Sequence, residues 1–109
     1  MKLYFYIYDS FFNKLKYGEC EVIEKPKTYY PADKFPAGFY GAYVSKTDIG
    51  RTSGYSNNTV ILTERNDTLA KSLLKEAIQK EIDDFQKKIE KRQKEIDFID
   101  IWESEENHD

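Results

Sequence analysis

Residues 50–54 have the residue types that bind an anion: Gly50-Arg51-Thr52-Ser53-Gly54. Two glycines free the backbone, Arg51 offers a forked set of N–H donors, and Thr52 and Ser53 add hydroxyl groups. The segment is not a P-loop, because the Gly-Lys-Ser/Thr ending is missing and no helix is expected directly after it. We favour an ordinary hairpin loop made of turn residues over a phosphate or nucleotide site.

Other residues that could catalyse a reaction are few. The only histidine is His108, next to the last residue, so we expect no Ser–His, Cys–His or histidine–metal arrangement. Cys20 falls in the middle of a predicted strand, where a small core residue is expected rather than a nucleophile. The sequence therefore predicts a protein that is not an enzyme and that has no metal and no cofactor.

Aromatic residues are more numerous than a small core requires, with nine tyrosines and seven phenylalanines in 109 residues. The candidate partner contacts in the sheet half are Tyr4, Tyr6, Tyr8, Tyr40 and Tyr43. Aromatic rings on a sheet can stack on single-stranded nucleic acid, but tyrosine is also enriched at protein interfaces. Because residues 1–65 are only mildly positive, at +2, and residues 66–109 are acidic, at −5, we favour contact with a protein. A nucleotide or nucleic-acid binder that uses the tyrosine face and residues 50–54 is the alternative, and some of these rings are expected to pack in the core.

Residues 1–65 are predicted to form an antiparallel sheet of about four strands. Leucine, phenylalanine and isoleucine alternate with tyrosine over residues 2–8, which indicates a central strand with bulky side chains on both faces. Further strands are predicted at 15–24, 39–46 and 59–64, with a short edge strand at 27–30 and a long hairpin loop at 47–58. Strands followed by a helix predict the α+β class.

Residues 66–102 are predicted to form one long helix that packs on the sheet and continues into an association seam. The chain has no Gly or Pro after Asn66, and Asn66-Asp67-Thr68 is a favourable start. Such a helix spans roughly 50 Å, whereas 65 compact residues have a radius of gyration of about 11 Å. We therefore expect part of the helix to extend beyond its own sheet. Residues 103–109 are predicted to be an acidic disordered tail.

Apolar residues first cover a broad helix face and then narrow to a seam. The broad face, expected to lie on the sheet, contains Leu69, Leu73, Leu74, Ala77 and Ile78. The association seam has coiled-coil spacing and consists of Ile82, Phe85, Ile89, Arg92, Ile96 and Ile99. Arg92 stands where an apolar residue belongs, so a parallel dimer would bring two guanidinium groups together. We expect a homodimer and favour the antiparallel form; a monomer whose helix folds back near Arg92 is the alternative.

Composition and charge bound the setting in which the protein acts. Hydrophobic residues make up 39% and charged residues 34% of the chain, which is typical of a soluble globular protein. There is no 18-residue apolar run and no signal peptide, so we expect no membrane contact. The single Cys20 fits a reducing cytoplasm. Apart from His108, all charged groups after Lys94 are acidic, and this negative charge repels nucleic acid. We favour a terminus that keeps the protein soluble over a binding site there.

One stretch of the sequence carries a resemblance to a known group of proteins: Glu19-Cys20-Glu21-Val22-Ile23-Glu24-Lys25-Pro26-Lys27-Thr28-Tyr29. It is followed by a predicted strand that ends in Thr63-Glu64-Arg65 and by a long charged helix. In this layout the chain resembles short accessory proteins of phages and prophages of Gram-positive bacteria. The resemblance brings no catalytic residues. It implies the context of a mobile genetic element, whose accessory proteins include inhibitors of host defence such as anti-CRISPR proteins. Such inhibitors bind a host protein or sequester a small signal. The expected function is therefore a protein-binding module of a mobile element, with a host protein as target.

Overall fold

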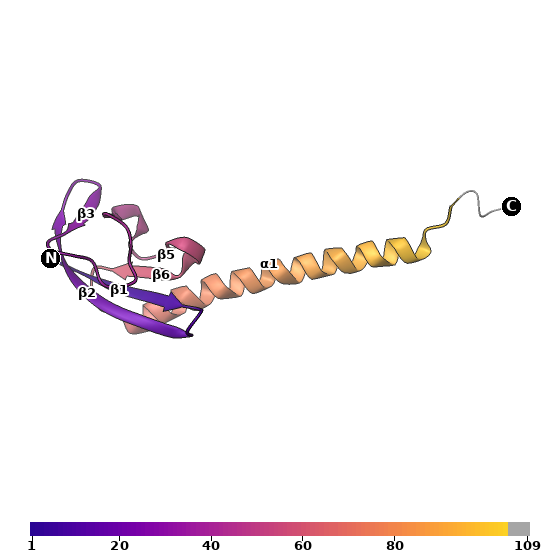
Figure 1. Ribbon diagram of the computed structural model, residues 1–109, viewed down its shortest axis with the longest axis horizontal. Helices are drawn as coiled ribbons and strands as arrows, with labels where there is room; N and C mark the ends of the chain where they lie inside the picture. The colour runs from indigo at the N-terminus through magenta and orange to yellow at the C-terminus, as the bar shows by residue number, and fades with distance from the viewer. Residues whose placement is uncertain (105–109) are drawn as a thin grey trace. The chain divides into compact units, whose positions relative to one another are not determined.

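The computed structural model describes residues 1–104 and has an α+β fold, a curled antiparallel sheet of six strands followed by one long helix (Figure 1). The elements are β1 (Lys2–Asp9), β2 (Lys14–Glu24), β3 (Thr28–Pro31), β4 (Val44–Ser45), the short 3₁₀ helix η1 (Lys46–Asp48), β5 (Thr52–Ser53), the 3₁₀ helix η2 (Tyr55–Asn57), β6 (Thr59–Leu62) and α1 (Asp67–Ile101). The chain divides into two compact units, residues 1–77 and 78–109, and α1 contributes to both. His108 and most of the predicted tail lie outside the described residues.

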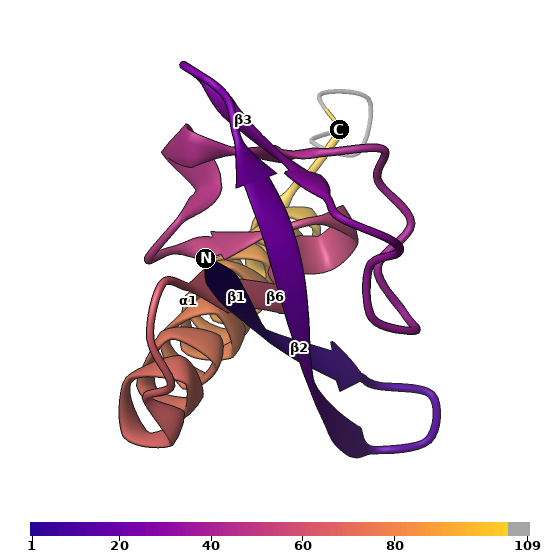
Figure 2. The ribbon, with the colours of Figure 1, turned by 90° about the vertical axis from the view of Figure 1, so that its left-hand side faces the viewer.

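The strand order is β4-β3-β2-β1-β6-β5, so β1 is central, as its alternation predicts. The long strand β2 takes part in two ladders: its first part pairs with β1 and its last part, from Val22 to Glu24, pairs with β3. Figure 2 shows β2 running the height of the sheet between these two partners. The sheet therefore curls around β2 instead of lying flat.

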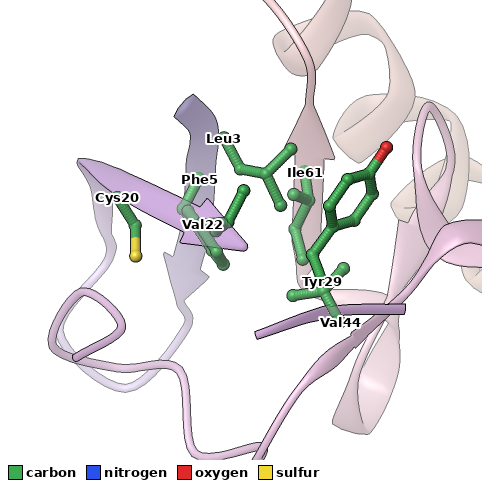
Figure 3. Close-up of a cluster of buried hydrophobic side chains, with 7 residues drawn as sticks. All are labelled: Leu3, Phe5, Cys20, Val22, Tyr29, Val44 and Ile61. Carbon is green, nitrogen blue, oxygen red and sulfur yellow. The ribbon is translucent and has the colours of Figure 1, made fainter. Parts of the chain in front are cut away.

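One face of β1 carries the first core cluster, which Figure 3 shows as sticks. Its members are Leu3, Phe5, Cys20, Val22, Tyr29, Val44 and Ile61. Phe5 is fully buried, and its ring centroid lies 5.6 Å from that of Phe35 and 5.3 Å from that of Phe39. The segment between β3 and β4 thus closes one side of the core with two aromatic rings.

The opposite face of β1 carries the second cluster, which joins the sheet to the first turns of α1. Its buried members are Tyr6, Val60, Leu62, Ala70 and Leu74. The helix begins as its sequence predicts, because the Asn66 side-chain oxygen accepts a hydrogen bond from the Leu69 N–H at 3.0 Å. Asp67 adds a negative charge in the first turn, where the helix dipole favours it.

The strand predictions need three corrections. Residues 39–43 are not in a strand, because the Phe39 ring turns in to pack on Phe5 and the Phe39 N–H closes a turn onto the Pro36 carbonyl oxygen at 3.2 Å. The predicted loop at 47–58 contains β5 and η2, since Thr52 and Ser53 pair with β6. The third strand is not an edge, because it lies between β2 and β4.

Gly18 is required by the close approach of the loop that carries Phe35. It pairs with Phe5 across β1 and β2, and a Cβ atom at this position would lie 2.6 Å from the Cβ of Pro36. We predict that Gly18→Ala lowers the free energy of unfolding by about 1–3 kcal/mol, because the Pro36 loop must move away from the core. Urea denaturation followed by circular dichroism measures this. Unchanged stability would contradict the close contact.

Candidate functional site

The first candidate site is an aromatic hollow of about 440 Å³ in the first unit. Tyr40, Tyr43 and Tyr55 lie on its wall and rim, and Tyr40 and Tyr55 are each 94% exposed. Among the described residues that line it, Asp48 is the one charged side chain. A carboxylate among tyrosine rings repels phosphate, so the chemistry of the hollow disfavours a nucleotide.

The Gly50–Gly54 segment borders this hollow and is built into the sheet. Gly50 and Gly54 have φ angles of +78° and +80°, which only glycine adopts without strain. The Gly50 N–H donates to the Ile61 carbonyl oxygen at 3.0 Å, and Thr52 and Ser53 form β5. The two glycines are therefore needed for the backbone conformation of this segment, in addition to the role in anion binding considered above. The Arg51 side chain is exposed. Anion binding here stays a prediction.

The five candidate tyrosines do not form one surface. Tyr6 is 3% exposed, and Tyr4 and Tyr8 are partly covered and pack against the same cluster, beneath the first turns of α1. Tyr6 is therefore not available to a partner, and this face of β1 serves mainly as core. Tyr40 and Tyr43 are exposed, and the Tyr43 ring lies 5.7 Å from that of Tyr30.

The Tyr6 hydroxyl fixes the start of α1 to the sheet. It donates to the Asp67 carboxylate at 2.6 Å and accepts a hydrogen bond from the Asn66 N–H at 3.2 Å. Arg65 also reaches Asp67, with its Nε at 3.2 Å from the carboxylate. The hydrogen bond from Tyr6, followed by that from Arg65, lowers the pKa of Asp67 below its ordinary value.

Tyr17 lies beside this junction and is unsuited to acid–base chemistry. Its ring lies 4.4 Å below the Arg65 guanidinium, and its hydroxyl donates to Glu19 at 2.9 Å. Partial burial, together with the hydrogen bond to Glu19, raises the pKa of Tyr17 to about 12. The phenol therefore stays protonated at neutral pH, and the group has a structural use.

Cys20 is buried, and its sulfur lies 3.2 Å from the carbonyl oxygens of Glu21 and Lys34. Burial raises the pKa of the Cys20 thiol, which disfavours the reactive thiolate. Within residues 1–104 no group of three or more histidine, cysteine or acidic side chains is arranged to hold a metal ion. In the same range, no helix has the length and apolar character needed to span a membrane.

The second candidate site is the association seam of the second unit. From Ile78 to Ser104 every described residue is exposed except Glu95 and Ser104, which are half-buried. Ile89 and Ile99 are 67% and 69% exposed although both are large and apolar. The seam residues follow one another at steps of three and four within one uninterrupted helix of 35 residues, so they lie along one side of it.

Arg92, the polar member of the seam, has a partner in its own helix. Its guanidinium donates to the Glu95 carboxylate at 2.7 Å, one turn further along α1. The positive charge in the seam is therefore already balanced, and Arg92 can lie against an apolar neighbour through its aliphatic stem.

Sequence reasoning missed four apolar residues of α1 and its end. Ile78, assigned to the sheet-covering face, is 44% exposed and lies one step of four before Ile82, so it extends the seam. Phe98 and Ile101 are exposed on another side of the helix, and Trp102, which follows the helix end at Ile101, is also exposed. The step of four before Ile82 could have identified Ile78.

Comparison with protein-family models, with curated proteins and with solved structures found no match for this chain. Within the structure, the hollow and the seam are the two features from which function is inferred. Of the two, the seam is the larger departure from an ordinary protein surface, since large apolar side chains follow a regular spacing there.

The hydrogen bond between Tyr6 and Asp67 predicts a pH-dependent stability. A carboxylate with a lowered pKa in the folded state stabilises the fold above its unfolded pKa of about 3.9, and this contribution is lost as the pH falls through the folded pKa. We predict that Tyr6→Phe lowers the free energy of unfolding by about 1 kcal/mol at pH 7 and by less at pH 3, measured by urea denaturation.

Tyr8→Phe is the matched control, because the Tyr8 hydroxyl lies on the same face of β1 but donates to the uncharged Asn13 amide at 2.8 Å. Its effect on stability is expected to be the same at both pH values. An equal effect of Tyr6→Phe at pH 7 and pH 3 would show that Asp67 does not carry the pH dependence.

Proposed function

We propose that this protein is a non-enzymatic protein-binding module whose docking surface is the association seam of its second unit. The observation that supports the proposal is the exposure of regularly spaced isoleucine and phenylalanine side chains from Ile82 to Ile99. A helix paired with this side would bury them as knobs in a coiled coil. The hollow, with Asp48 among tyrosine rings, disfavours the nucleotide alternative.

Burial of the seam supplies the driving force for association. Fully burying a large apolar side chain is worth about 1.5–3 kcal/mol, and the seam residues are about half exposed, so each contributes roughly half of that. Association itself costs about 4–15 kcal/mol. Five such residues from each of two helices are sufficient to offset a cost of that size. We expect binding that depends on protein concentration in the micromolar range.

The biological setting is a further part of the proposal. The likeness of residues 19–29 to phage accessory proteins supports a mobile genetic element as the source, acting in the host cytoplasm. The target would be a host protein, and inhibition of a defence system such as CRISPR–Cas is the activity we propose. Copurification from host cells that carry such a system tests the target, and loss of capture with Ile89→Asp would show that the target binds only the seam-paired assembly.

The seam predicts the effect of one substitution on assembly. Ile89→Asp places a charge at the middle of the seam, so we expect the assembly to dissociate to monomers while the sheet stays folded. Sedimentation velocity at several concentrations measures the mass, and circular dichroism checks the fold. Phe98→Asp is the matched control, since Phe98 is 63% exposed but lies off the seam.

Two outcomes would contradict the proposal. The first is a native chain that stays monomeric at high micromolar concentration. The second is an assembly that Phe98→Asp dissociates and Ile89→Asp does not, because the docking surface would then lie on another side of the helix.

A further inference from the structure

We infer that the seam pairs with the seam of a second copy of this chain, antiparallel, with Ile82 opposite the partner's Ile99 and Ile89 opposite the partner's Arg92. The inference rests on the proposed function and names the partner of the same surface. It adds an orientation, a register and an ion pair that the exposure of the seam alone does not specify.

The spacing of the seam is the first support. The steps from Ile82 to Ile99 are three, four, three, four and three residues, and this series reads the same in both directions. In an antiparallel pair, each step forward on one helix is matched by an equal step backward on the other. Phe85 then faces the partner's Ile96, so all six seam positions meet seam positions.

Arg92 is the second support, because it distinguishes the two orientations. A parallel pair in register brings the two Arg92 side chains into one layer, where like charges face each other in an apolar seam. In the antiparallel register each Arg92 packs beside the partner's Ile89 instead. The Glu95 carboxylate of the same helix, 2.7 Å from the Arg92 guanidinium, already balances its charge, so the layer needs no further counter-ion.

Charges along one edge of the seam are the third support. Glu81, Lys88 and Glu95 are spaced by seven residues and therefore lie on one side. In an antiparallel pair with two-fold symmetry, this edge of one helix lies beside the same edge of the other helix. In the inferred register Lys88 and the partner's Glu95 differ in level by two residues, about 3 Å. Helical side chains lean toward their own N-terminus, so in this pair the two side chains converge.

The same edge disfavours the other registers. A shift that places Ile78 opposite the partner's Ile96 keeps the apolar layers. It makes Glu81 converge on the partner's Glu95 and Lys88 converge on the partner's Lys88, so like charges repel. In a parallel pair, the edge that carries Glu95 would lie beside the opposite edge of the partner's seam, and Glu95 would lie near the partner's Asp100. The remaining edge carries Gln79, Gln86 and Gln93, which add no repulsion. Charge complementarity thus selects one arrangement.

Cysteine cross-linking tests the orientation in the full chain. Cys20 is buried, so new thiols on the helix are the accessible ones. Chains with Ile82→Cys are mixed with chains with Ile99→Cys under mild oxidation, and we expect a mixed disulfide dimer. Each variant alone should remain mostly uncross-linked, because equal positions lie far apart in an antiparallel pair. Self-cross-linking of both single variants would show a parallel dimer and overturn the inference.

A charge exchange tests the register. Lys88→Glu and Glu95→Lys should each raise the dissociation constant roughly tenfold, because each dimer holds two copies of the pair. In the double variant the interhelical pair is restored but Arg92 lacks its Glu95 partner, so the dissociation constant should fall below that of Glu95→Lys alone without reaching the native value. Lys87→Glu, with the same charge change on the opposite side of the helix, is the control and should have little effect.

The failure of this inference is distinguishable from that of the proposed function. If Ile89→Asp dissociates the assembly but the double variant binds no more tightly than Glu95→Lys alone, the register is wrong and the seam remains the docking surface. If Ile89→Asp has no effect on mass, the seam is not used and both proposals fail.

Discussion

A single buried hydroxyl sets how the first unit is put together. Tyr6 lies at 3% exposure on the central strand, and the start of α1 supplies both of its partners, the Asn66 N–H and the Asp67 carboxylate. A buried hydroxyl left unpaired costs about 1–3 kcal/mol, so the helix has one favourable starting point over the sheet. Once that point is fixed, the helical period brings Ala70 and Leu74 onto the sheet.

Features of the fold that depend on local periodicity could be predicted from the sequence, and those that depend on distant contacts could not. Alternation over residues 2–8 predicts the central strand, and the lack of Gly and Pro predicts α1 almost to its ends. Residues 39–46 have strand propensity, but the Phe39 ring is drawn to Phe5, which lies far away in the sequence. Val44–Ser45 is the part of the predicted strand 39–46 that pairs with β3, whereas the strand at Thr52–Ser53 depends on a pairing with β6 that no local pattern reveals.

The candidate site divides in the same way. The seam is a spacing within one helix, so its residues could be named from the sequence, whereas two residues assigned to the sheet-covering face, Leu69 and Ile78, are 41% and 44% exposed. The tyrosines of β1 suggested a binding platform because nothing in their alternation tells which face the helix covers. Their enrichment has two separate causes in the structure: packing around Tyr6, and exposed rings such as Tyr40 beside the hollow.

The brevity of the outermost strands has a consequence for how this protein can assemble. β4 and β5, which end the sheet, contain two residues each, so they present few unpaired backbone N–H and C=O groups. Along β4 and β5 another chain therefore finds almost no template for strand addition, which is the usual route to fibrils. In the function proposed above, recognition depends instead on side chains of the helix, where partner choice can be altered residue by residue without disturbing the folding of the sheet.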